Sequence, residues 1–209
     1  MKKFYSFAGT PSLRPMRTTA GAAAVVAALA VALPQAAGKD VIPPNVPAGI
    51  AITDGSTAYL IGHAEGTQNY ICLPSGSSFA WTLFGPQATL FDDYGRQIIT
   101  HFLSGNPDEN GTLRATWQHS GDTSAAWAMA VATSSDSAFV APGAIPWLKL
   151  DVVGTEFGPQ LGEKLTRTTW VQRVNTYGGV APAAGCSGAT NVGAKVFVPY
   201  TADYVFYRQ

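Results

Sequence analysis

His101 is the residue of this chain best suited to proton transfer, because an imidazole titrates close to neutral pH. Asp92 and Asp93 precede it by a short stretch of chain, and a histidine beside a carboxylate can act as a general base or a metal ligand. A hydrolase interpretation therefore takes His101, Asp92 and Asp93 as its catalytic candidates. In the alternative interpretation His101 has only a structural role. The two aspartates then belong to a hairpin turn, whose composition residues 92–95 have.

Other motifs of catalysis or cofactor binding do not occur in the sequence. The three histidines share no short spacing of the kind that zinc sites use. There is no G-x-S-x-G serine motif, and no glycine-rich loop of a dinucleotide-binding or P-loop fold. We therefore expect no cofactor and no metal site.

A second group of polar residues lies within strongly apolar segments and supplies the ligand-binding candidates Arg173, Asn175, Asp203 and Tyr200. Our first interpretation is structural: Arg173 and Asp203 form a buried ion pair. In the functional alternative, a carboxylate or a sugar hydroxyl docks on Arg173, and Trp170 or Tyr200 forms an apolar wall.

The five tryptophans could also form a surface on which sugars stack. Trp81, Trp147 and Trp170 lie in apolar runs and are expected in the core. Trp117 and Trp127 are the freer candidates for contact with a ligand.

The N-terminal part of the chain has the pattern of an export signal. Residues 21–33 are an uninterrupted run of Ala, Val, Leu and one Gly, and four basic residues but no acid precede it. This pattern is typical of a signal peptide, and the run is shorter than the roughly 20 residues of a membrane-spanning helix. We predict a signal peptide over residues 1–37 and a secreted or periplasmic domain over 38–209, with no stable membrane span after cleavage.

The chain has two cysteines, Cys72 and Cys186. An even cysteine count in an exported chain predicts a disulfide, here one that joins distant parts of a single domain. After removal of residues 1–37, nine basic and thirteen acidic residues remain, with no basic cluster. Nucleic acid is therefore excluded as a partner.

Short runs of strand length, rich in β-branched and aromatic residues, recur between turn-forming residues. They are residues 58–62, 69–73, 79–84, 97–102, 112–118, 127–133, 147–153, 166–174, 194–199 and 203–207. In the run 166–174, strand alternation places Val171 and Arg173 on one face and Trp170, Gln172 and Val174 on the other. No segment keeps a helical apolar stripe over the length of a helix. We predict an all-β single domain, an antiparallel sandwich or barrel with one disulfide.

An ordered series of motifs resembles a known family of secreted proteins, catalogued as the domain of unknown function numbered 3455. The motifs are NYIC (69–72), WTLFGPQATL (81–90), HF (101–102), IPWL (145–148), VQRVNT (171–176), GGVAP (178–182), GC (185–186) and VPYTADY (198–204). The resemblance covers the whole mature chain. It implies secretion and a β-rich domain, and it brings no catalytic residues.

The sequence therefore leads to two hypotheses. The first is an envelope or extracellular binding module whose partner is a small molecule or a glycan. The alternative is a hydrolase-like enzyme that uses His101 with Asp92 or Asp93. Convergence of these three side chains in a pocket would favour the enzyme.

Overall fold

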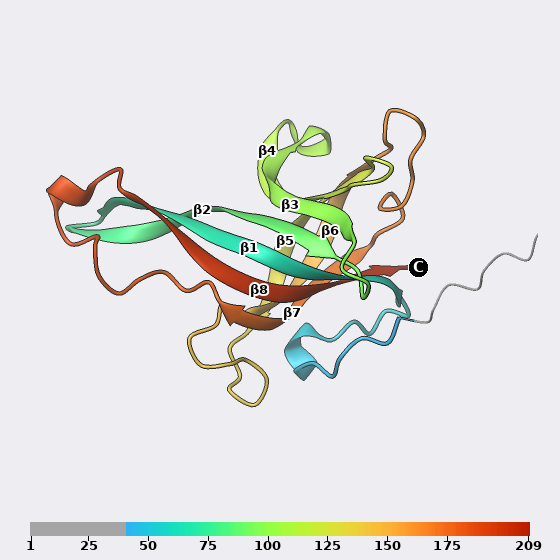
Figure 1. Cartoon of the computed structure of the whole chain (residues 1–209), viewed down its shortest axis with the longest axis horizontal. Helices are drawn as coiled ribbons and strands as arrows, with labels where there is room; N and C mark the ends of the chain where they lie inside the picture. The colour runs from blue at the N-terminus through green and yellow to red at the C-terminus, as the bar shows by residue number, and fades with distance from the viewer. Residues whose placement is uncertain (1–40) are drawn as a thin grey trace, which may run out of the picture. The chain divides into compact units, whose positions relative to one another are not determined.

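Each strand of the computed structural model pairs antiparallel with the next one along the chain, and the last strand returns to the first, so that the sheet closes into a barrel (Figure 1). The structure describes residues 41–209, and the predicted signal peptide lies outside this range. The strands are β1 (Thr57–Ser75), β2 (Ser78–Phe91), β3 (Gln97–Asn106), β4 (Thr112–His119), β5 (Ala125–Ser134), β6 (Trp147–Glu156), β7 (Trp170–Gly178) and β8 (Lys195–Arg208). The all-β prediction is confirmed, and the barrel is the architecture adopted.

Three short 3-10 helices, η1 (Ala48–Ile50), η2 (Pro107–Glu109) and η3 (Ala189–Asn191), interrupt the loops. Within residues 41–209, no helix is long and apolar enough to cross a membrane.

The first and last strands are longer than the sequence pattern suggests. The predicted runs 58–62 and 69–73 both belong to β1, and the runs 194–199, apart from its first residue, and 203–207 both belong to β8. The reason is that β1 pairs with β2 on one side and with β8 on the other along most of its length. Two ladders of backbone hydrogen bonds therefore hold the intervening polar and glycine residues in a strand.

These long strands form an arm beyond the barrel. β3 pairs with β2 only from Ala88 to Phe91, so the part of β2 before Ala88, with the adjoining parts of β1 and β8, continues as a three-stranded arm (Figure 1). The base of this arm, at Leu83 and Pro86, still faces the lumen. The predicted disulfide lies in the arm: Cys72 of β1 bonds Cys186 in the loop before β8, with Cα atoms 5.4 Å apart.

Two apolar cores flank the wall of the barrel. The inner core fills one end of the lumen with large buried side chains such as Leu90, Ile99 and Phe206. The outer core packs the segment around η1, through Ile50, against Val174 and Val205 on the outside of the wall. β7 contributes to both cores by strand alternation, and the predicted division of its residues between two faces is confirmed.

Candidate functional site

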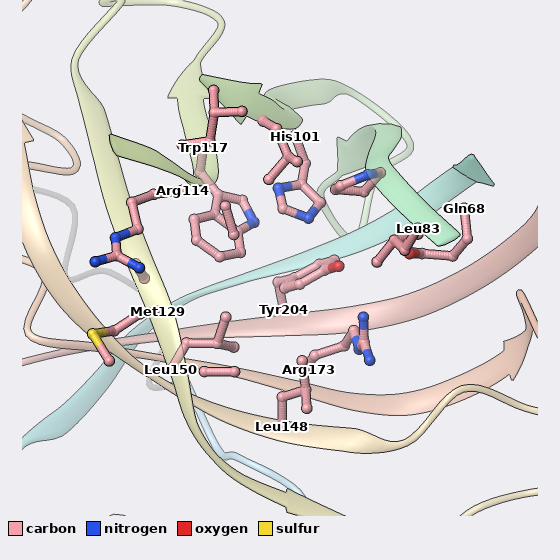
Figure 2. Close-up of a pocket in the computed structure, with 16 residues that line it drawn as sticks. Gln68, Leu83, His101, Arg114, Trp117, Met129, Leu148, Leu150, Arg173 and Tyr204 are labelled. Atoms are coloured by element: carbon pink, nitrogen blue, oxygen red, sulfur yellow. The ribbon is translucent and has the colours of Figure 1, made fainter. Parts of the chain in front are cut away.

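The lumen is not filled along its whole length. Above the inner core lies a cavity of about 350 Å³ to which all eight strands contribute (Figure 2). Its lining comprises Gln68, Leu83, Pro86, His101, Leu103, Leu113, Arg114, Ala115, Trp117, Ala128, Met129, Ala130, Leu148, Leu150, Arg173 and Tyr204. Leu83, Leu113 and Met129 are 49%, 66% and 38% exposed, so the cavity reaches the surface through an apolar rim. A volume of this size suits a small organic molecule.

Three aromatic rings in mutual contact form one side of the cavity. His101 of β3 lies directly opposite Trp117 of β4 in the strand register, and their rings stack with centroids 4.5 Å apart and planes within 8° of parallel. Tyr204 of β8 packs against both, with its ring centroid 4.9 Å from that of His101 (Figure 2). Contacts of this kind hold large rings in fixed orientations, so this wall of the cavity is rigid.

His101 is neutral at physiological pH. The residue is 3% exposed, and Nδ1 lies 2.8 Å from the carbonyl oxygen of Thr116. Because a carbonyl oxygen only accepts hydrogen bonds, Nδ1 carries the proton. Burial disfavours the charged imidazolium and lowers the pKa of His101 to about 3, and the nearby charge of Arg173 acts in the same direction. A histidine with so low a pKa is a poor general base near pH 7.

The structure does not bring Asp92 or Asp93 to His101. Both aspartates lie in the turn between β2 and β3, whereas the His101 side chain points into the lumen from the middle of β3. The Asp92 carboxylate binds Arg96, at 2.7 Å, and backbone N–H groups of the same turn. Asp93 lies 3.1 Å from Nε2 of His63. The geometry that the hydrolase interpretation requires is therefore not present.

The predicted ion pair between Arg173 and Asp203 is wrong, and strand register explains why. In the pairing of β7 with β8, Arg173 lies opposite Tyr204 and Val174 lies opposite Asp203. Side chains of successive residues point to opposite faces, so Arg173 enters the lumen while Asp203 lies on the outer face of the barrel. Arg173 instead donates from Nε and Nη2 to the carbonyl oxygen of Pro146, at 3.2 and 2.8 Å.

The other cation of the lining, Arg114, is neutralised. Its guanidinium binds both carboxylate oxygens of Glu109, at 2.8 and 2.6 Å, and Asn106 donates a further hydrogen bond to the same carboxylate. These contacts, that with Arg114 foremost, lower the pKa of Glu109 to about 2. In Figure 2 the Arg114 side chain turns to the side of the cavity away from Arg173.

One buried nitrogen atom of the lining carries an N–H group without an acceptor. Trp117 Nε1 makes no hydrogen bond within residues 41–209, although the side chain is fully buried, whereas the equally buried Gln68 side chain interacts with the Tyr200 hydroxyl. Trp117 and Trp127, the tryptophans proposed for contact with a ligand, do not form an exposed stacking surface, since they are 0% and 6% exposed, but Trp117 lines the cavity. Unpaired buried donors are costly, and in a cavity wall they suit a ligand that supplies acceptors.

The remaining ligand-binding candidates lie behind or outside the cavity. Tyr200 is buried behind Tyr204, and their hydroxyl oxygens are 3.2 Å apart. Burial raises the pKa of both tyrosines, so both hydroxyl groups stay protonated. Asn175 donates to Asp203 on the outer face of the barrel, at 2.8 Å.

The outer face also holds a contact that the sequence did not suggest. Asp203 accepts from Nδ1 of His63 at 2.7 Å, and Nε2 of the same ring faces Asp93. Partial burial of the ring favours its neutral form, but the hydrogen bonds to Asp203 and Asp93 outweigh it and raise the pKa of His63. Within the described part of the chain, no three or more His, Cys, Asp or Glu side chains are arranged to hold a metal ion.

The sequence singled out Trp117 for contact with a ligand but did not place it beside His101, and it did not single out the lining residues Gln68, Arg114 and Tyr204. For Trp117 a signal was available, because His101 and Trp117 are equally distant along the chain from Glu109 in the β3–β4 turn. A hairpin centred on that turn places them opposite each other. For Gln68, Arg114 and Tyr204 no local signal distinguishes the lumen from any other buried face.

Comparison with known proteins gives one relationship. No curated protein and no solved structure matches the chain significantly. A family described as "Protein of unknown function (DUF3455)" matches residues 53–208, which span all eight strands and every residue that lines the cavity. The chain belongs to the DUF3455 family.

Proposed function

We propose that this protein is an exported binding module that holds a small, largely apolar molecule in the lumen of its barrel. The observation that carries the proposal is the cavity of about 350 Å³, which reaches the surface at one end and is closed by the inner core at the other. Eight-stranded barrels have an interior just wide enough to hold one small ligand. The export signal in residues 1–37 supports a location outside the cytoplasm.

The chemistry of the walls favours binding over catalysis. Most of the lining is aliphatic, and the one histidine has its Nδ1 proton committed to Thr116 and a pKa far below neutrality. An apolar pocket with a few polar groups is typical of sites that recognise small molecules.

The test is a titration with the neutral, apolar fluorescent probe N-phenyl-1-naphthylamine, which becomes brighter in apolar surroundings. Ala128 is buried in the cavity wall, so Ala128→Phe places a phenyl ring inside the cavity. We expect the wild type to bind the probe and Ala128→Phe to bind it at least about tenfold more weakly, a loss of roughly 1.4 kcal/mol.

The matched control is Ala80→Phe, which adds the same ring to an exposed position on the arm. It should bind the probe like the wild type, and circular dichroism should show that both variants are folded. Equal binding by the wild type and a folded Ala128→Phe protein would place the probe outside the lumen and contradict the proposal.

A further inference from the structure

The charges that face the cavity do not balance. The lining contains two arginines and no carboxylate. Arg114 is paired with Glu109 in a two-point contact, whereas no carboxylate among residues 41–209 lies within salt-bridge distance of Arg173. The lumen therefore holds one positive charge without a counter-ion.

Arg173 also keeps hydrogen-bonding capacity in reserve. A guanidinium has five N–H groups. Nε and Nη2 donate to the one carbonyl oxygen of Pro146, and a further contact reaches the Tyr204 hydroxyl, which still leaves N–H groups for an acceptor that a ligand brings. Figure 2 shows the guanidinium on the Gln68 and Tyr204 side of the cavity, away from Arg114. Trp117 Nε1 adds an N–H group without an acceptor in the same lining.

A half-buried cation without a counter-ion and a buried donor without an acceptor each carry a desolvation cost in the empty protein. A ligand that brings a negative charge and acceptor oxygens offsets both costs, whereas a ligand with a positive charge increases them. One free positive charge matches a monoanion, and the planar fork of a guanidinium matches the two oxygens of a carboxylate. A phosphate monoester, with up to two negative charges, would lack a second free cation here.

We propose that the molecule bound in the lumen is a small monocarboxylate with an apolar chain, whose carboxylate binds Arg173 and whose chain packs against Leu103, Leu148 and Leu150. This assignment rests on the proposed function and adds the chemical class of the ligand. In this assignment Arg173 determines the specificity of the site for a carboxylate.

The test compares three probes of equal chain length, octanoate, octanol and octylammonium, by isothermal titration calorimetry at neutral pH. We expect the wild type to bind octanoate at least about tenfold more tightly than octanol, since hydrogen bonds between charged groups are stronger than those between neutral groups. Octylammonium should bind most weakly of the three.

Three variants separate charge from hydrogen-bond geometry. Arg173→Met should bind octanoate no better than octanol, while its affinity for octanol, which also reports that the barrel is folded, stays near that of the wild type. Arg173→Lys keeps the charge without the fork and should retain part of the preference for octanoate. Arg167→Met removes one positive charge from an exposed position and should behave like the wild type.

The outcomes distinguish the two proposals. If none of the three probes binds to the wild type, the proposed function fails, and the ligand assignment fails with it. If octanol and octanoate bind equally well, or if Arg173→Met or Arg173→Lys leaves the preference for octanoate unchanged, the lumen is a binding site but the carboxylate assignment is wrong.

Discussion

Acid should destabilise this protein through His101, and His101→Phe should remove that part of the acid response. Burial lowers the pKa of His101 to about 3 in the folded protein, whereas in the unfolded chain the ring has its ordinary pKa of 6.5. Between these two values the unfolded state binds a proton that the folded state does not bind, so the free energy of unfolding falls as the pH falls. Above about pH 6.5 the contribution is constant.

The magnitude follows from the size of the pKa shift. Each pH unit between the two pKa values costs about 1.4 kcal/mol, so acidification from about pH 7 to about pH 4.5 removes between about 2 and 3 kcal/mol through this one group. With a urea dependence of about 2 kcal/mol per molar, that loss lowers the unfolding midpoint by about 1 M. This is a large share of a typical domain stability of about 5–15 kcal/mol.

The assay is urea unfolding of the wild type and His101→Phe across this pH range. The phenyl ring keeps the stack on Trp117 but cannot donate to Thr116, which should cost about 1–3 kcal/mol at neutral pH because a buried carbonyl oxygen loses its partner. On acidification, however, the variant should lose about 2–3 kcal/mol less stability than the wild type. Parallel pH profiles for the two proteins would show that His101 is not buried in a neutral form and would refute this reasoning.

Two further predictions concern the disulfide and the outer histidine. The bridge joins residues 114 positions apart, so the Cys72→Ala/Cys186→Ala variant should lose about 2–5 kcal/mol in urea unfolding, and an unchanged midpoint would mean that the arm is already held by strand pairing. His63, whose pKa is raised, contributes stability at low pH that is lost as the pH rises through its folded-state pKa. Asp203→Asn should lower that pKa in an NMR titration of the His63 ring, and an unchanged titration would contradict the contact as the cause.

Local pattern was enough to predict the class of the fold. The alternation in β7 put Val171 and Arg173 on one face, and the structure has both in the lumen. The choice between sandwich and barrel was not accessible from the sequence. Closure depends on the pairing of β1 with β8, whose residues, such as Thr57 and Arg208, are distant in the chain and carry no mutual signal.

The candidate site was predictable only where it depended on alternation. Strand alternation predicted that Arg173 lies on the same face as the apolar Val171. The docking of a carboxylate on Arg173 was one of the alternatives considered. The residue opposite Arg173 could not be predicted, because a shift of one residue in the β7–β8 register decides whether Tyr204 or Asp203 faces it. The same limit explains the failure to place His63 beside Asp203, from which it is separated by 140 residues.

The central claim, that the lumen is a binding site, can be tested most directly by the indole N–H signals of the protein in ¹H–¹⁵N NMR spectra during titration with octanol. Trp117 Nε1 lies in the cavity wall without an acceptor, whereas Trp81 Nε1 lies on the arm and donates to the carbonyl oxygen of Ala184 at 2.9 Å. The Trp117 signal, assigned with the variant Trp117→Phe, should shift as octanol is added, and the Trp81 signal should stay in place. Two results would contradict the claim. In one, the Trp81 signal shifts while the Trp117 signal stays in place; in the other, no indole signal shifts as octanol is added.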